Sequence, residues 1–480
     1  MNLTPEARAG IDATWNDEIV PALMDYVAIP NVSPAYEPRW AELGHMDVAT
    51  EMFRAWAADR KIEGMSVEVV RLGERTPVIL IEVAAIGEAD PDAPAVLLYG
   101  HLDKQPEMEG WDEGKGPWTP IIEDGRMYGR GGADDGYAMF ASLAAIEAVR
   151  TSGAAHRRLV VLIEASEESG SPDLPAYIDH LAPRLGDIDF VVCLDSGCAD
   201  YENLWVTTSL RGVVGGTLSV EILEEGVHSG SASGVVPSSF RILRQLLSRV
   251  EDPATGEVLV PECQADVSES RLAQIGASAD SIGGGFGASF PFVSGARPVD
   301  GTPMELILNR TWRSTLSVVG FDGAPAPGAA GNVLRPRTRA QLSFRLPPTV
   351  DHEVALAAIE RTLTDDPPYG ARVTFDDPEG GPGWAAPELE SWLAVALDRA
   401  GQAHFGAPAQ FMGEGGSIPF MAMLGERFPA AQFVITGVLG PGSNAHGPNE
   451  FLDLSMGRRL TACVAEILME HAGSPTLHAV

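Results

Sequence analysis

Four short runs of apolar residues stand out along the 480-residue chain. They cover 94–100, 158–165, 189–196 and 432–439. Each is rich in valine, isoleucine and leucine over nearly its whole length, which is typical of strands that are buried on both faces of a sheet. Helical patterns lie between them, for example over 136–153 and 174–186. This alternation predicts an α/β domain with a mostly parallel sheet that is flanked by helices.

The middle of the chain has a different pattern. Residues 212–223 and 338–348 alternate apolar and polar positions, as half-exposed strands do, and helical patterns lie around 237–250 and 351–364. Because the fourth apolar run comes after this part, we expect a smaller α+β domain inserted into the α/β domain. The expected bounds are 1–210 and 379–480 for the α/β domain, and 211–378 for the insertion.

Two segments predict irregular connections. Residues 265–300 are rich in serine, glycine and alanine, which favours a long loop. The segment "DDPEGGPGWAAPE", residues 376–388, predicts the linker that returns to the α/β domain.

Composition narrows the class of protein. The formal net charge of −34 argues against nucleic acid or an anionic membrane as a partner. No apolar run reaches membrane-spanning length, and the acidic start of the chain lacks the pattern of a secretory signal. We therefore expect a cytoplasmic location. The four cysteines form no C-x-x-C pair, and we expect reduced, buried thiols.

Side chains that can bind metal ions follow each apolar run. They are His101 and Asp103 after the first run, Glu167 and Glu168 after the second, Asp195 after the third, His446 after the fourth, and Asp134 in the glycine-rich segment 128–137. Open α/β sheets bind ligands beyond the carboxyl ends of their strands. Two histidines and five carboxylates should therefore gather in one crevice.

Such a cluster needs cations, because neighbouring carboxylates repel one another and unpaired burial of a charge is costly. Histidine and carboxylate ligands suit zinc, manganese or cobalt, and the lack of a cysteine ligand set argues against a structural zinc site. The number of ligands allows two ions that share one bridging carboxylate. Alone, a pair of glutamates often starts a helix and a strand-end aspartate is often an N-cap. Their joint occurrence at four strand ends favours a metal site.

The segment "YGRGGADDGY" has a second interpretation as a dinucleotide-binding loop. The sixth position of its "GRGGAD" stretch is Asp134 instead of glycine or alanine, and no apolar strand directly precedes it. A phosphate site also needs positive charge and backbone N–H groups, not two carboxylates. We expect the glycines to let the backbone turn Asp134 into the crevice.

Six motifs occur in an order that resembles a known family. The motifs are "GHLDKQP", "YGRGGADDG", "EASEESGS", "LDSG", "GEGGSIP" and "AHGPNE". Over essentially the whole chain they resemble the dinuclear zinc peptidase family of carboxypeptidase G, aminoacylase and succinyl-diaminopimelate desuccinylase. The chain is most similar to the carnosine-type (cytosolic non-specific) dipeptidases. The resemblance implies a zinc-exopeptidase-like catalytic domain with an inserted lid domain, through which two copies form a homodimer.

The resemblance also implies two divalent metal ions, zinc first, with manganese or cobalt as other choices. His101 and Asp195 would bind one ion, and Glu168 and His446 the other. Asp134 would bridge both, and the family implies a cis peptide bond after it.

Further roles follow from the same resemblance. Asp103 would accept a hydrogen bond from the far nitrogen of His101, and Glu167 would be the general base for a water between the metals. In the lid, His228 would stabilise the oxyanion, often from a partner subunit. The residues expected to bind substrate are Arg345, Asn332, Gly416 and Ser417.

The implied function is a metal-dependent dipeptidase that cleaves short peptides with a free C-terminal carboxylate. An amidohydrolase of N-acyl amino acids is the alternative, and a non-catalytic binding protein on the same fold is a remote one. The chain departs from the family pattern at Gly136 and Tyr137, where Lys and Gly are usual, and at Gly413, where Arg is common. Because glycine at position 413 lacks the charge that arginine would bring to the expected pocket, the identity of the substrate stays open.

Overall fold

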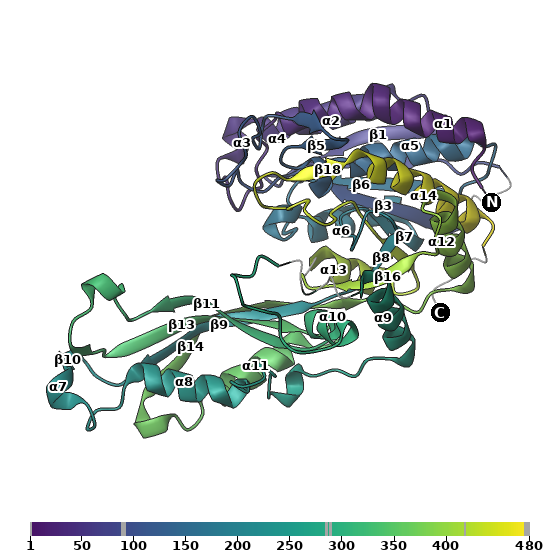
Figure 1. Ribbon diagram of the computed structural model, residues 1–480. Coiled ribbons are helices and arrows are strands. Elements are labelled where there is room, and N and C mark those ends of the chain that lie inside the picture. The colour runs from purple at the N-terminus through teal and green to yellow at the C-terminus, as the bar shows by residue number, and fades with distance from the viewer. Residues whose placement is uncertain (1, 88–92, 284–286, 288–289, 417–418, 475–480) are drawn as a thin grey trace. The chain divides into compact units, whose positions relative to one another are not determined.

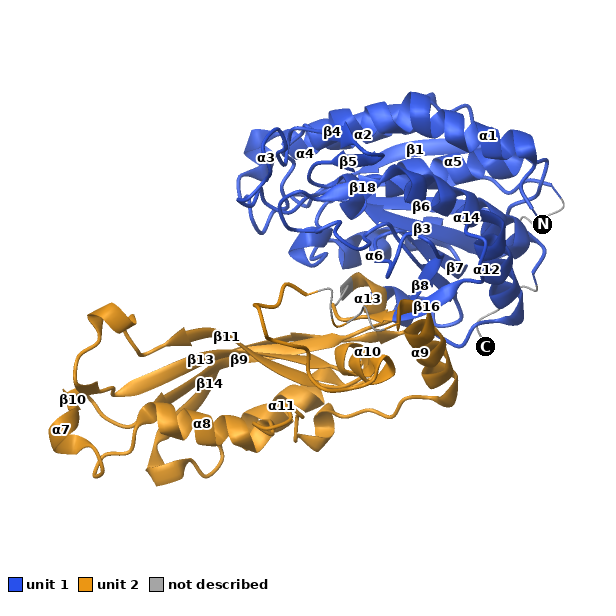
Figure 2. Cartoon of the chain, viewed as in Figure 1, with its two compact units in different colours: residues 1–208, 386–412, 423–480 blue, residues 209–385, 413–422 orange. Residues whose placement is uncertain are grey.

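The computed structural model describes the whole chain except residues 1, 88–92, 284–286, 288–289, 417–418 and 475–480 (Figure 1). The chain divides into two compact units (Figure 2). Unit 1 consists of residues 1–208, 386–412 and 423–480, and unit 2 of residues 209–385 and 413–422. The sequence suggested an insertion over 211–378, but it gave no sign that 413–422 would belong to the same unit.

The main sheet has the strand order β1-β2-β6-β3-β7-β17-β8-β15, and β16 pairs with β8. The pairs β6–β3, β3–β7 and β7–β17 are parallel, so the four apolar runs form neighbouring strands at the centre of the sheet. This confirms the predicted α/β fold. The bounds are β1 Met65–Val70, β2 Val78–Val83, β3 Ala95–His101, β6 Leu159–Glu164, β7 Ile188–Cys193, β8 Trp205–Leu210, β15 Trp384–Ala385, β16 Gln410–Glu414 and β17 Gln432–Ile435.

Helices of unit 1 pack on this sheet (Figure 1). Helix α5 is buried along almost its whole length, because α1 and α14 pack against it. No helix of the described chain is both long enough and apolar enough to cross a membrane. The helices are α1 Pro5–Thr14, α2 Val20–Val27, α3 Trp40–Leu43, α4 His45–Asp59, α5 Ala138–Thr151, α6 Leu174–Leu185, α12 Ser391–His404 and α14 Leu454–Ala472; α13, Pro419–Arg427, crosses a boundary between the units.

A small sheet of order β18-β5-β4 ties two distant parts of unit 1 together. Its strands are β4 Ile121–Glu123, β5 Arg126–Tyr128 and β18 Phe451–Asp453. β5 leads directly into the glycine-rich segment, and β18 follows the loop that carries His446. Their antiparallel pairing therefore holds these two loops beside each other.

Unit 2 is built on an antiparallel sheet of order β11-β13-β9-β14, against which α8 and α11 pack. Strand β13 shows the predicted alternation, with every second side chain buried. A separate two-stranded ribbon joins β10 to β12. The bounds are β9 Gly212–Glu221, β10 Val227–His228, β11 Thr315–Asp322, β12 Val333–Leu334, β13 Arg337–Leu346, β14 Arg372–Gly381, α7 Ser229–Ala232, α8 Ser239–Val250, α9 Glu269–Ile282, α10 Pro303–Thr311 and α11 His352–Thr364.

Two expected loops are wrong in part. The segment 265–300 contains helix α9, which begins after the N-cap Ser268 and packs its Ile275 and Ala279 against α10. Small side chains there fill a helix contact, so their abundance did not signal a loop. The segment 376–388 is not a free linker either, since β14 continues to Gly381 and β15 follows it.

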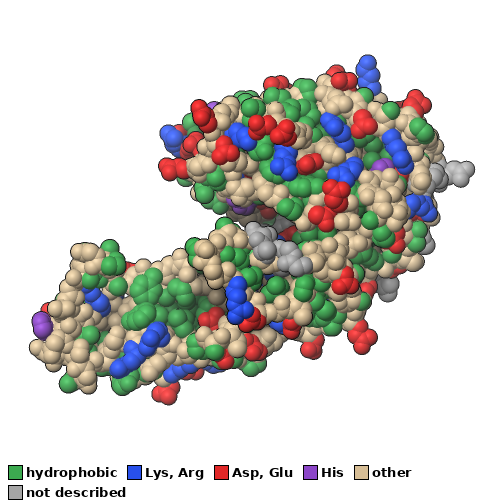
Figure 3. All heavy atoms as spheres, in the orientation of Figure 1, with side chains coloured by type: hydrophobic (Ala, Val, Ile, Leu, Met, Phe, Trp, Pro, Cys, Tyr) green, Lys and Arg blue, Asp and Glu red, His purple; other side chains and the backbone are tan. Residues whose placement is uncertain are grey.

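Acidic side chains lie on several parts of the visible surface of each unit (Figure 3). They are interspersed with lysine and arginine side chains and form no single dominant patch in this view. Asp134, Glu168 and Asp195, which the sequence suggested as metal ligands, are instead buried.

Candidate metal centre

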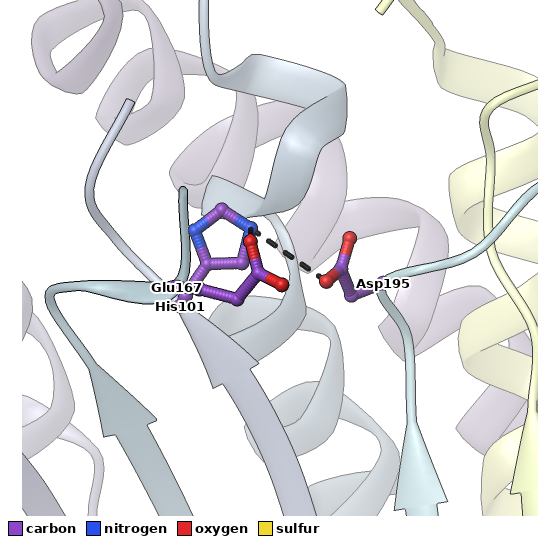
Figure 4. Close-up of side chains that lie close together, drawn as sticks. All are labelled: His101, Glu167 and Asp195. Atoms are coloured by element: carbon purple, nitrogen blue, oxygen red, sulfur yellow. Dashed lines mark ion pairs between the residues drawn. The ribbon is translucent and has the colours of Figure 1, made fainter. Parts of the chain in front are cut away.

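The parallel strands place their carboxyl ends side by side, and the predicted ligands lie there. His101 is the last residue of β3. Glu167 and Glu168 open a 3₁₀ helix, Glu167–Ser169, that follows β6, and Asp195 lies two residues beyond β7. Figure 4 shows the side chains of His101, Glu167 and Asp195 directed toward one another. Since β3 lies between β6 and β7, all three strand ends contribute to one cluster.

Asp134 lies between the two histidines. Its Oδ1 is 3.4 Å from Nε2 of His101, and its Oδ2 is 3.0 Å from Nε2 of His446. On the first side, His101 Nε2 is 3.7 Å from Oδ2 of Asp195. On the second side, His446 Nε2 is 3.4 Å from Oε2 of Glu168. The five residues thus form two groups that share one carboxylate.

The neighbouring Asp135 supports this arrangement from behind. The peptide bond between Asp134 and Asp135 is cis, as the sequence resemblance implied. Asp135 is fully buried, and its Oδ2 accepts a hydrogen bond of 3.3 Å from the backbone N–H of His101. This contact requires Gly100, because a Cβ there would lie 2.7 Å from both Asp135 Oδ2 and Ala138 Cβ.

Asp103 connects the first strand end to the second. Its two carboxylate oxygens accept the backbone N–H groups of Glu167 and Glu168, each at 3.0 Å. Its Oδ1 is also 3.5 Å from Nδ1 of His101, and its backbone carbonyl oxygen is 3.2 Å from the same nitrogen. One side chain therefore fixes the first turn that carries both glutamates and faces the ring of His101.

An ion pair missed by sequence reasoning ties the glycine-rich segment to the loop of His446. Glu450 pairs with Arg130 and accepts the backbone N–H of Gly131 at 2.8 Å, and Arg130 donates to the carbonyl of Gly447 at 3.0 Å. Both charged side chains are buried. The lone arginine in "YGRGG" and the glutamate that ends "HGPNE" were the available signals.

A further contact holds Glu168. Gln105 Nε2 donates to Oε2 of Glu168 at 2.6 Å. The same oxygen is 3.4 Å from Nε2 of His446, so Gln105 helps to hold the carboxylate beside this histidine. Gln105 stands in "GHLDKQP" and was not singled out by the sequence.

The charges of this cluster are strongly coupled. Burial lowers the pKa of His101, but the carboxylates of Asp195, Asp103 and Asp134 outweigh it and hold that pKa well above its usual value. Burial raises the pKa of Asp195 to about 6. Burial, with the charge of Asp195, also raises the pKa of Glu167, and burial with the charge of Asp134 raises that of Glu168. Negative charge is therefore in excess here, which a bound cation relieves.

The donor set fits divalent metal ions. Nε2 of His101 is buried and has no hydrogen-bond partner among the described residues, although carboxylates surround it. Ligand atoms of His101, Glu167 and Asp195 lie within 4.8 Å of one another, and so do those of His101, Asp134 and Glu168. Imidazole and carboxylate groups without thiolate suit zinc, manganese or cobalt.

The remaining candidate residues belong to unit 2 and form two groups there. His228 is exposed in β10, next to exposed Asn332, whose carbonyl accepts the N–H of Ser229. Arg345 lies in β13, and the carbonyl of Gly416 accepts the backbone N–H of Arg211. Ser417 lies outside the described residues.

Arg211 was missed by the sequence, although it organises the second of these groups. Its side chain donates to the carbonyl of Gly415 at 3.1 Å and to Thr315 at 3.2 Å, and Thr315 faces Arg345 across the sheet. Burial, with the charges of Arg345 and Arg310, lowers the pKa of Arg211 to about 10. Guanidinium groups therefore gather beside the turn at 414–416.

The structure also explains the glycine at position 413. A Cβ there would lie 2.5 Å from Ser209 Oγ and 2.9 Å from Thr311 Cβ. Arg310 instead reaches this turn from α10 and pairs with Glu414 at 2.9 Å. A guanidinium thus lies beside the turn even though position 413 carries no side chain.

Comparison with known proteins shows which family and which solved structures this chain resembles. Residues 97–470 match Peptidase family M20/M25/M40. The chain is 27% identical over 429 residues to the cysteinylglycine-S-conjugate dipeptidase of Corynebacterium striatum, covering 86% of this chain and 88% of that protein. It is 26% identical over 431 residues to the Beta-Ala-His dipeptidase of Homo sapiens, covering 85% and 82%. The fold resembles that of di-peptidase Dug1p from Saccharomyces cerevisiae, with a TM-score of 0.72 and 22% identity over 98% of both chains. The resemblance inferred from the motifs is confirmed.

We predict that Gly100→Ala destabilises the protein by about 1–3 kcal/mol, because the new methyl group overlaps Asp135 and Ala138. Chemical denaturation monitored by circular dichroism measures the change. The control is Gly10→Ala in α1, where no atom lies within 4 Å of the new Cβ and alanine favours the helix. Equal stability of the Gly100→Ala variant and the wild type would contradict the tight packing behind His101.

Proposed function

The chain belongs to Peptidase family M20/M25/M40, and from this premise we propose that it is a metal-dependent dipeptidase that hydrolyses short peptides with a free C-terminal carboxylate. The observation that carries the proposal is the position of Asp134 between two histidines, with Glu167 beside them. The named relatives, which match more than four fifths of the chain, are dipeptidases.

We propose that the centre holds two divalent ions. His101 and Asp195 would bind one, Glu168 and His446 the other, and Asp134 would bridge them. Zinc is the proposed metal, and manganese and cobalt suit the same donors. When bound, such ions supply Lewis acidity toward a substrate carbonyl and make a water molecule easier to deprotonate.

Glu167 is the proposed general base. Its Oε2 lies 4.0 Å from Nε2 of His101, and its backbone N–H is held by Asp103. From this position the carboxylate can accept a proton from the attacking water and give it to the leaving amine nitrogen. The hydrogen bond that Asp103 accepts from this N–H limits the movement of the main chain that carries the base.

Residues of unit 2 would recognise the substrate. Arg345 would bind its carboxylate through two parallel hydrogen bonds, as guanidinium does well. Gly416 and Ser417 would line that end, Asn332 would contact the substrate, and His228 would donate to the developing oxyanion.

The geometry of unit 2 supports a homodimer in which two copies complete each site. Strand β13 runs from Arg337 to Arg345 over eight residue steps, which is about 26 Å in extended chain. His228 of β10 pairs with Val333 of β12, which precedes the Arg337 end of β13; Figure 1 labels β10 and β13. A dipeptide spans no more than about 7 Å. If His228 and Arg345 act on one dipeptide, they must therefore come from different chains.

The surface of β11 supports the same proposal. This strand is at the edge of its sheet, where its main-chain groups are available for pairing. Val319 and Phe321 are more than half exposed on it, and Val318 nearly half. An exposed apolar edge strand is a common site of contact with another protein surface, and we propose a second copy of this unit as the partner.

The cellular location that we propose is the cytoplasm. Support comes from the cysteines, all four of which are free and buried. Thiols in this state are typical of proteins in a reducing compartment.

A substrate panel tests the proposed reaction. We expect hydrolysis of unmodified dipeptides and little hydrolysis of the matching N-acetyl amino acids, with loss of activity on chelation and recovery on adding zinc. Release of free amino acid is measured for both sets at equal concentration. Activity confined to the N-acetyl set would contradict the dipeptidase and favour the amidohydrolase.

Replacement of Glu167 by Gln tests the base. We expect kcat to fall by about 10²–10⁴-fold, because the amide cannot accept the proton, while metal content stays at the wild-type level. Steady-state kinetics and elemental analysis measure the two quantities. The exposed Glu113→Gln variant is the control for the chemical change. Unchanged turnover would show that another group is the base.

Mixed dimers test the role of His228. We expect His228→Ala and Glu167→Gln homodimers to be nearly inactive, and a statistical mixture of the two chains to recover about a quarter of wild-type activity, because half of the dimers then contain one intact site of two. Mixing His228→Ala with the double variant should recover nothing. Absence of recovery in the first mixture would exclude action across the dimer.

A further inference from the structure

Lys104 is a fully buried lysine beside the metal centre. Its Nζ donates to the carbonyl oxygens of Tyr26 and Ile29, each at 2.8 Å, and lies 3.4 Å from that of Val27. It also lies 3.8 Å from the centre of the Tyr26 ring. Burial of an ammonium group is costly unless its donors are satisfied. The carbonyls at the end of α2, where the helix dipole is negative, meet this need.

The carbon chain of Lys104 crosses the glycine-rich segment. A Cβ added at Gly131 would lie 2.6–2.8 Å from three of its methylene carbons. Position 131 also has a φ of +83°, which favours glycine. The side chain therefore fits between α2 and the segment that leads to Asp134.

The main chain around Lys104 is held as well. Its carbonyl accepts the N–H of Ser33 at 2.9 Å. The carbonyl of Leu102 accepts from the hydroxyl of Tyr26 at 2.7 Å and from the side chain of Asn31 at 2.5 Å. Residues 102–104 are thus fixed against the segment 26–33 by both main-chain and side-chain contacts.

Asp103 lies inside this fixed stretch. Because its carboxylate holds the backbone of Glu167 and Glu168, a shift of residue 103 would move both glutamates and release the face next to His101. We propose that Lys104 is a positioning residue for the metal centre, which acts by holding Asp103 in place through α2. This inference rests on the metal centre of the proposed function.

Position and charge predict opposite effects for this lysine. A positive charge on Lys104 would repel the two divalent ions that we propose, so charge alone predicts that its removal strengthens metal binding. Positioning predicts that its removal weakens metal binding. The sign of the change in metal affinity therefore separates the two.

The test uses Lys104→Met, which keeps the length of the side chain and removes the ammonium. Cobalt binding to the metal-free protein is measured by calorimetry and by the visible absorption spectrum of the bound ion, and Tm is measured in parallel. The control is Arg157→Met. Arg157 is also buried, pairs with Asp189 at 2.7 Å, and lies just before β6, at the opposite end of that strand from Glu167.

We expect both variants to lower Tm, and only Lys104→Met to weaken cobalt binding, by about tenfold or more, and to change the spectrum. Unchanged or tighter cobalt binding in Lys104→Met would overturn the proposal. If that variant does not fold, Lys104→Gln decides, since its amide keeps donors without the charge: weaker binding than wild type supports positioning, and wild-type or tighter binding overturns it. A wild-type protein that binds no metal would instead refute the proposed function.

Discussion

Repulsion among carboxylates is the constraint on which the arrangement of the site in unit 1 depends. The carboxyl ends of three parallel strands and two further loops bring Asp134, Glu167, Glu168 and Asp195 around only two histidines. A packed interior stabilises such a group only when donors or cations face each charge. The folded chain supplies part of this through hydrogen bonds, and the metal ions that we propose would supply the rest.

Several buried side chains support the cluster without belonging to the expected ligand set. Asp135 and Asp103 accept hydrogen bonds from backbone N–H groups of residues in the cluster. They therefore hold the backbone of these residues without adding side-chain donors that would compete with a metal. Glu164, the last residue of β6, is buried as well. Burial raises its pKa to about 7, and the hydroxyl of Tyr99 donates to its carboxyl group at 2.5 Å. The buried side chain of Lys104 donates to the carbonyl of Tyr26, and that of Arg130 pairs with Glu450.

Sequence patterns predicted the parts of this protein that depend on local order. Buried parallel strands are apolar over their whole length, so β3, β6, β7 and β17 could be recognised without the fold, and polar residues directly after them marked the cluster. Helix α9 was missed because alanine and serine at its packed positions look like loop composition. Glu450 and Arg211 were missed for another reason. Their partners lie 320 and 204 positions away, and no spacing along the chain records such a contact.

The glycines of "YGRGGADDGY" show how a local sequence pattern depends on contacts with distant parts of the chain. They leave room for neighbours: a Cβ at Gly129 would meet Val27, one at Gly136 would meet Tyr26, and one at Gly131 would meet Lys104. Two of these neighbours belong to the last turn of α2, and the third is bonded to it. The end of α2 and the side chain of Lys104 therefore limit the path that the segment can take. Asp134 reaches both histidines because α2 fixes the path of the backbone before it. This explains why the segment before the proposed bridging carboxylate is rich in glycine although it binds no phosphate in our proposal.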